Sequence, residues 1–245
     1  MKINYAIMGA NSSPMYLDFW PIISKTWKEI FNITPVLGLI CDEDTNFIED
    51  EYGLIKKFKT IEGIDTGLQS QIVRLFLTKE LYGNIIISDI DMVPLSKQYF
   101  IDQVEDFEAS KIYSMSTDNT ECNHNKEIPM CYNISDSQLF AKMLTLDNTW
   151  QEFVYRLNSM NLGWTTDQRY LWLKLQEYHN NNPSDVVFLN RGWHQCADRR
   201  IDRMEWIYES NLVSSGFYID SHLLRPYNQH KDEIDKLVNL LWESE

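Results

Sequence analysis

Two acidic residues, Asp89 and Asp91, are separated by a single residue and follow the apolar run of residues 85–87, with Ser88 in between. Three consecutive isoleucines predict a strand that is covered on both faces of a sheet. Where the strand ends, both carboxylates can turn toward one point. Oxygen ligands of this kind suit hard cations such as Mg²⁺ and Mn²⁺. The pair therefore indicates a candidate metal site, although aspartates at strand ends also serve merely to cap the next turn.

A divalent cation at these carboxylates would bridge the phosphates of a ligand and offset the charge that builds on a diphosphate leaving group. An anionic ligand needs such local help, because 36 acidic and 22 basic residues give the chain a formal net charge of −14. The same charge argues against nucleic acid and against an anionic membrane surface as partners.

The elements around the pair predict an α/β fold, with a mostly parallel central sheet flanked by helices. Open sheets of this kind bind ligands beyond the carboxyl ends of their strands, which is where the two aspartates are expected. We predict one continuous domain over residues 1–245. Strands are expected at residues 3–8, 36–41, 54–58, 85–87, 111–115, 130–134 and 216–219, and helices at residues 17–30, 66–81, 150–160, 166–179 and 231–242, with an exposed loop at residues 116–129.

The cysteines and the apolar segments indicate where the protein resides. Cys41, Cys122, Cys131 and Cys196 form no CxxC pair, so neither a zinc ribbon nor a redox motif is indicated and a reducing compartment is expected. The apolar start of the chain is too short for a signal-peptide core, and no segment approaches the roughly 20 apolar residues of a membrane span. We therefore expect a cytoplasmic protein without a membrane span.

The segment from Gln71 to Leu95 resembles the glycogenin and bacterial galactosyltransferase group. There, a helix carrying an arginine, a short turn, an apolar strand and Asp-X-Asp follow in this order. The layout of the chain is also similar to small glycosyltransferases of large DNA viruses that infect algae. The resemblance implies a GT-A (Rossmann-like) fold, with residues 1–115 as the nucleotide-binding half and residues 116–245 as the acceptor-side half. It further implies a nucleotide-sugar donor such as a UDP-sugar, a glycan acceptor, and Mn²⁺ or Mg²⁺, with Mn²⁺ favoured.

The same resemblance implies roles for residues in matching positions. Asp91 would hold the metal most directly, and Asp89 would touch both the metal and the donor ribose, with Ser88 and Ile90 beside them in the donor site. Arg74 would reach the diphosphate or support Asp89, unless it is simply a surface arginine of its helix.

A histidine near the C-terminus completes the metal shell in these families, where it is followed by a basic residue and a proline. His222, Arg225 and Pro226 match this element, so His222 is the expected third metal ligand and Arg225 a phosphate contact. The family usually places a glycine and a lysine between the histidine and the proline. Because this chain lacks them, a purely structural histidine remains the alternative.

The end of the first expected strand is where this fold places the donor base. Met8, Gly9, Ala10 and Asn11 occupy it, and Gly9 and Ala10 are small enough to let a ring approach the backbone. No GxGxxG or P-loop pattern is present, so a dinucleotide cofactor is not indicated.

The acceptor side is expected around Asp167 and Gln168, between two predicted helices. Asp167 could accept the proton of the acceptor hydroxyl, which would give inversion. The Asp-Gln pair also resembles a retaining group that needs no such base. A third possibility is that Thr165 or Thr166 caps the helix, with Asp167 in its first turn.

Three further features carry weaker expectations. Trp164 and Trp193 are candidate platforms for a sugar ring, whereas residues 191–196 fit no standard metal site. The cluster at residues 198–203 alternates in charge, and a solvated or salt-bridged surface explains it.

Two other functions fit part of the pattern. An apolar strand followed by Asp89 and Asp91 also opens haloacid-dehalogenase-type phosphatases, in which the first aspartate is a nucleophile. Such enzymes usually place this strand first and need a later acidic pair, and the sequence contains no Asp-Asp. The other alternative is a non-catalytic module that binds a nucleotide sugar or a glycan.

Overall fold

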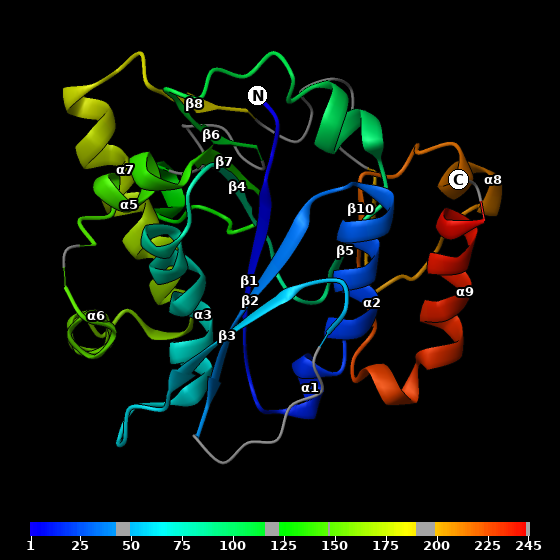
Figure 1. Cartoon of the computed structure of the whole chain (residues 1–245), viewed down its shortest axis with the longest axis horizontal. Helices are drawn as coiled ribbons and strands as arrows, with labels where there is room; N and C mark the ends of the chain where they lie inside the picture. The colour runs from blue at the N-terminus through cyan, green and yellow to red at the C-terminus, as the bar shows by residue number, and fades with distance from the viewer. Residues whose placement is uncertain (43–49, 116–122, 147, 190–198, 244–245) are drawn as a thin grey trace.

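A twisted central sheet runs through the molecule (Figure 1). The computed structural model describes residues 1–42, 50–115, 123–146, 148–189 and 199–243, and over these residues seven strands form the sheet in the order β3-β2-β1-β4-β7-β6-β8. Neighbouring strands are parallel except that β7 is antiparallel to both β4 and β6. The predicted α/β class is therefore confirmed. The strands are β1 (Tyr5–Asn11), β2 (Thr34–Cys41), β3 (Leu54–Lys59), β4 (Asn84–Ile87), β6 (Ile112–Ser114), β7 (Asn133–Asp136) and β8 (Val186–Phe188).

Helices cover both faces of the sheet, and a separate apolar core lies between each face and its helices. Strand alternation separates the cores, since Ile7 of β1 belongs to one and Met8 to the other. The Ile7 core includes α3 (Thr66–Phe76), α5 (Ser137–Met143), α6 (Trp150–Ser159) and α7 (Thr166–Asn181). The Met8 core includes α2 (Trp20–Lys25), α8 (Ser210–Ser214) and α9 (Lys231–Trp242), with α1 (Pro14–Leu17) at its edge. Short 3₁₀ or π segments lie at Thr26–Ile30, Leu77–Glu80, Gln98–Asp102, Gly163–Thr165 and Tyr227–Gln229.

A second, small sheet brings the C-terminal part of the chain to the aspartates. Within the described ranges its strands follow the order β5 (Met92–Pro94), β10 (Asp220–His222) and β9 (Arg200–Ile201). His222 pairs with Met92, and the amide of Leu223 donates to the carbonyl of Asp91 at 2.9 Å. Backbone pairing therefore fixes His222 next to Asp91.

Four sequence expectations need correction. The helix expected at residues 17–30 is divided into α1, α2 and the π segment. The strand expected at residues 130–134 begins only at Asn133, because the Asn133 side chain donates to the carbonyls of Pro129 (2.8 Å) and Met130 (3.0 Å) and holds a turn there. The run at residues 216–219, expected as a strand, is not one: the strand β10 begins only after it, and Gly216 has a positive φ of 69°, which a strand does not allow. Of the loop expected at residues 116–129, residues 116–122 lie outside the described chain and residues 123–125 form a helical turn.

The contact between α3 and the sheet depends on glycine. Gly9 of β1 and Gly38 of β2 are register partners, and both face α3. A Cβ atom at Gly9 would lie 2.1 Å from the Ser70 carbonyl oxygen and 2.8 Å from Val73 Cγ1. The missing side chain therefore lets α3 approach the sheet closely enough to hold Arg74 at the end of β4.

Gly9→Ala is expected to lower the free energy of unfolding by about 3 kcal/mol, because the atom in the way at Ser70 belongs to the backbone of a packed helix. Urea unfolding measures the change. Gly63→Ala is the matched control: nothing lies within 4 Å of its added Cβ, and its φ of 79° adds only backbone strain of about 1 kcal/mol. Equal losses in the two variants would show that the close approach of α3 is not required.

Candidate active site

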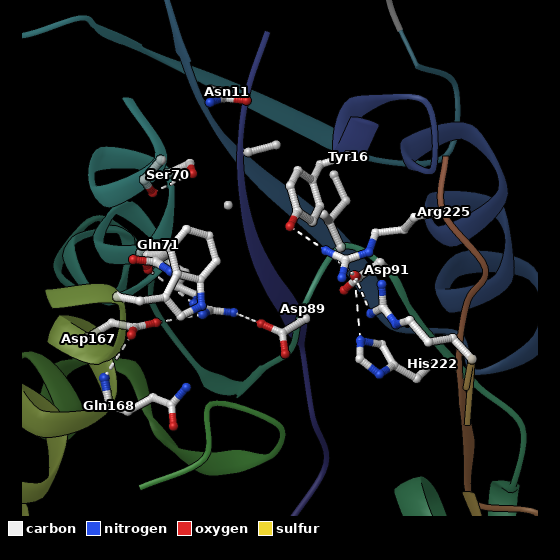
Figure 2. A pocket seen from close by; sticks show the side chains of 17 residues that line it. Asn11, Tyr16, Ser70, Gln71, Asp89, Asp91, Asp167, Gln168, His222 and Arg225 are labelled. Atoms are coloured by element: carbon white, nitrogen blue, oxygen red, sulfur yellow. Dashed lines mark hydrogen bonds and ion pairs between the residues drawn. The ribbon is translucent and has the colours of Figure 1, made fainter. Parts of the chain in front are cut away.

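A cavity of about 340 Å³ opens at the carboxyl ends of β1 and β4, and both aspartates line it (Figure 2). Its size is within the range of small-molecule sites. It brings together segments that lie far apart in the sequence. The described residues that line it are Gly9, Ala10, Asn11, Tyr16, Gly67, Ser70, Gln71, Arg74, Asp89, Ile90, Asp91, Trp164, Asp167, Gln168, Arg203, His222 and Arg225.

Asp91 lies on one side of this cavity among three basic side chains. Its Oδ2 atom accepts a hydrogen bond from Arg203 Nη2 at 2.7 Å and lies 3.6 Å from His222 Nε2 and 3.9 Å from Arg225 Nη1. Burial and the nearby Asp89 carboxylate raise the pKa of Asp91 to about 6. The fold thus holds this carboxyl where its negative charge is incompletely compensated.

Asp89 is held differently, although it is the neighbour of Asp91 in the motif. It forms an ion pair with Arg74 and accepts a hydrogen bond from Cys131 Sγ at 2.9 Å, while its backbone amide donates to the same sulfur at 3.1 Å. Burial acts to raise the pKa of Asp89, but Arg74 and the Cys131 hydrogen bond hold it below the usual value. Figure 2 shows Asp89 between Asp167 on one side and Asp91, His222 and Arg225 on the other.

Arg74 links the motif to α7. It donates from Nη2 to Asp167 Oδ2 at 2.7 Å and from Nη1 to the Ser88 carbonyl at 3.2 Å, besides its pair with Asp89. Its side chain is only 8% exposed, so the alternative of a surface arginine is wrong. Arg74 supports Asp89, as the resemblance implied, and it also lines the cavity.

Asp167 does not stand free toward an acceptor. Its side chain is 1% exposed, its Oδ2 atom is bound by Arg74, and its Oδ1 atom accepts from the Gln168 amide at 2.8 Å. Burial raises the pKa of Asp167. Because both oxygens are engaged, this geometry suits a residue that positions Arg74 better than it suits the base expected from the sequence. The first-turn position is confirmed, since α7 begins at Thr166.

Of the remaining residues that were expected in the donor site, some line the cavity and others are buried away from it. Gly9, Ala10, Asn11 and Ile90 line the cavity. The side chains of Met8 and Ser88 are fully buried and do not line it, so these two expectations need correction. Gly9 also has a packing role, because a Cβ atom there would meet α3, while the approach of a ligand ring to its backbone stays a prediction.

Four residues that line the cavity or hold its lining residues were missed or misinterpreted in the sequence. Tyr16 lines it, and its ring lies 5.2 Å from the Arg225 guanidinium, which also donates to the Tyr16 hydroxyl. Cys131 holds Asp89, and Arg203, expected on a solvated surface, pairs with Asp91. Gln71 lines the wall beside Arg74. No local pattern could have identified them, because only the folded chain brings them together.

Comparison with known proteins rests on structure, because no protein-family model and no curated protein matches the sequence. The galactosyltransferase LgtC, solved in complex with donor and acceptor sugar analogs, has a TM-score of 0.50 at 12% sequence identity, and the match covers 98% of this chain and 95% of LgtC. The chain has a GT-A fold. A glycosyltransferase involved in glycosylation of the major capsid of PBCV-1 gives a TM-score of 0.49 at 7% identity, with 97% of this chain and 98% of that chain covered.

In this GT-A fold, the side chains around Asp91 are of the types that bind divalent cations. Two carboxylates and one imidazole face one cavity, and His222 Nδ1 lies 3.8 Å from Asp202 Oδ2, where a carboxylate can orient a ligating histidine. Within the described part of the chain, however, no three His, Cys, Asp or Glu side chains are already gathered into a metal-binding group. A cation would therefore have to draw these side chains together.

The structure also bears on the expectations about a membrane span and about the two candidate tryptophan platforms. The described residues include no helix that is both long and apolar enough to cross a membrane. Trp164 lines the cavity with 69% of its surface exposed, whereas Trp193 and the segment 191–196 lie outside the described residues.

Proposed function

We propose that this chain is a metal-dependent glycosyltransferase that moves a sugar from a nucleotide-diphosphate donor, a UDP-sugar, to a hydroxyl group of a glycan. The observation that carries the proposal is the cavity at the strand ends of a GT-A fold, in which Asp89, Asp91 and His222 stand beside Arg74 and Arg225. Such a site offers oxygen and nitrogen ligands for a cation and guanidinium groups for phosphates.

Asp89, Asp91 and His222 would hold Mn²⁺, or Mg²⁺ in its place. The ion would supply positive charge to the diphosphate as the bond to the sugar breaks. Arg225 lies on the same side of the cavity, 3.9 Å from Asp91 Oδ2, and is held against Tyr16. In the proposal, its guanidinium binds a phosphate oxygen, while Arg74 keeps Asp89 charged and correctly oriented.

The two ends of the cavity are proposed to bind the two ends of the donor. Asn11, at the end of β1, and Tyr16, which also lines the cavity, are suited to the base, since an amide can hydrogen bond and an aromatic ring can stack. At the other end, the Gln168 side chain lines the cavity and forms no hydrogen bond to a described residue, so its amide is available to the sugar. Trp164 offers an exposed ring for the acceptor.

The charge balance of the cavity predicts that donor and metal bind together. Among its described lining residues, three arginines face three aspartates, so the cavity is neutral when His222 is uncharged. A diphosphate donor adds about two negative charges, and a divalent cation adds two positive ones. Each ligand alone leaves buried charge uncompensated, whereas the two together restore neutrality. Each is therefore expected to strengthen the binding of the other by the same factor.

Release of uridine diphosphate from UDP-sugars in the presence of Mn²⁺ tests the proposed function. A panel of UDP-hexoses is incubated with the protein, with and without chelator and with glycan acceptors. Hydrolysis or transfer that the chelator stops supports the enzyme. Binding of uridine diphosphate without any turnover, across the panel, would instead support the non-catalytic module.

The phosphatase alternative is not favoured by the geometry. A nucleophilic aspartate needs a carboxylate oxygen that is free to attack phosphorus. In the structure, one oxygen of Asp89 is paired with Arg74 and the other accepts from Cys131. Neither oxygen of Asp89 is therefore free to attack phosphorus.

The affinity for Mn²⁺ is expected to fall about tenfold between pH 7 and pH 5. Asp91 has a pKa of about 6 and must lose its proton to bind a cation, so protons compete with the metal increasingly as the pH falls through 6. Calorimetric titration of the protein with MnCl₂ at both pH values measures the effect. Repeating it at pH 5 in buffers of different ionisation enthalpy should reveal the released proton. An affinity that is constant over this range would show that Asp91 is not a ligand.

A further inference from the structure

Arg203 reaches the cavity from a turn that the preceding residue, Asp202, stabilises. The turn follows β9, and Asp202 holds it by accepting from the amides of Met204 (2.9 Å) and Trp206 (2.7 Å). From there, the Arg203 side chain reaches Asp91, with Nη2 at 2.7 Å from Oδ2. Only 10% of the side chain is exposed, so this pair is almost completely buried.

The hydrogen bonding of Arg203 is incomplete. Its Nε and Nη1 atoms are buried and find no hydrogen-bond partner among the described residues. Leaving buried donors of a charged group unpaired is unfavourable. Within the described chain, one hydrogen bond therefore holds the guanidinium group, and an acceptor that meets its other nitrogen atoms would stabilise it.

Arg203 also stands where a cation would bind. It bonds to Asp91 Oδ2, the oxygen that faces His222 Nε2 at 3.6 Å. A guanidinium group and a divalent cation at one carboxylate oxygen repel each other and compete for its negative charge. A cation that binds Asp91 Oδ2 would therefore displace Arg203 from it.

The neighbouring arginines show that this placement is specific to residue 203. Arg200 forms a bidentate pair with the buried Asp220, with both bonds at 2.6 Å. Arg199 packs over the Phe217 ring, 4.3 Å from its centroid. Of these three arginines, all in one short segment, Arg203 lines the cavity and the other two do not.

We propose that Arg203 is a tethered counter-ion that occupies Asp91 while the site is empty and binds the donor's diphosphate once a divalent cation has taken its place. The inference rests on the proposed function and adds a residue to it. The guanidinium group suits the second position because it can donate several hydrogen bonds to phosphate oxygens at once. Arg203 thus weakens the binding of metal alone and strengthens the binding of donor with metal.

Arg203→Gln tests the proposal by two titrations in the full chain, first MnCl₂ alone and then uridine diphosphate at saturating Mn²⁺. We expect Mn²⁺ alone to bind about tenfold more tightly than to the wild type, because the competitor is gone. Uridine diphosphate should then bind about tenfold more weakly, because a diphosphate contact is lost. Arg199→Gln, which removes the same charge from the same segment, is the control and should change both affinities less than twofold.

Effects of opposite sign on the two affinities would support the proposal, since a general loss of structure weakens both. If Arg203→Gln weakened both, or matched Arg199→Gln, the proposal would be overturned while the proposed function stood. Wild-type protein that bound neither Mn²⁺ nor uridine diphosphate would overturn both. Should Arg203→Gln not fold, Arg203→Lys replaces it. Lysine keeps the positive charge but cannot donate two parallel hydrogen bonds to a phosphate. In Arg203→Lys the proposal therefore requires weaker binding of uridine diphosphate without weaker binding of Mn²⁺.

Discussion

Asp91→Asn is expected to reduce Mn²⁺-dependent turnover of a UDP-sugar about a thousandfold. The amide has nearly the same shape as the carboxylate, but it removes the negative charge that would hold the cation, and with it the charge that neutralises the leaving diphosphate. Initial rates of uridine diphosphate release, with circular dichroism to confirm folding, measure the effect.

The matched control for Asp91 is Asp106→Asn, the same exchange at an exposed position outside the cavity. Its rate should equal that of the wild type. The substitution removes the charge with which Asp91 would bind the metal. Full activity in Asp91→Asn would therefore show that Asp91 is not a metal ligand. Similar losses in the two variants would point to a general effect of net charge.

Arg74→Met is expected to lower the free energy of unfolding by about 3–5 kcal/mol. Asp89 and Asp167 both pair with this guanidinium group, and the Asp167 side chain is 1% exposed, so its charge would lie buried without a cationic partner. Urea unfolding near pH 7 measures the loss. Arg169→Met, on α7, is the control: Arg169 is 43% exposed and pairs at 3.0 Å with Glu127, so its loss should cost less than about 1 kcal/mol.

A second substitution separates the charge effect at Arg74 from lost packing. Adding Asp167→Asn to Arg74→Met removes the stranded charge and should recover part of the stability, so the effects of the two substitutions should not be additive. Strictly additive losses would show that Arg74 does not stabilise Asp167 electrostatically.

Local sequence patterns predicted the strands and helices that form the centre of this fold. The run before Asp89 is β4, and the amphipathic stretch from Thr66 is α3. Apolar periodicity was sufficient for these elements because each is buried in the core. The central motif could be placed for the same reason, since residues that directly follow a buried strand must emerge at the end of the sheet.

The parts that could not be predicted depend on contacts between distant segments. The small sheet that places His222 beside Asp91 is built from strands of two or three residues, too short to show any periodicity. Arg203 belongs to an alternating charge cluster, and composition could not show which of its arginines reaches the cavity. Asp167 was expected to be available to an acceptor, but a residue 93 positions earlier, Arg74, occupies it. Such pairings are set by tertiary packing alone.

The central claim is that the cavity around Asp89 and Asp91 binds a divalent cation together with a nucleoside diphosphate. Calorimetric titration of the wild-type protein with uridine diphosphate, in the presence of Mn²⁺ and again with chelator, tests it most directly. The account predicts tight binding of one molecule per chain with Mn²⁺ and at least a tenfold loss of affinity without it. Equal affinity under both conditions, or no binding under either, would contradict it.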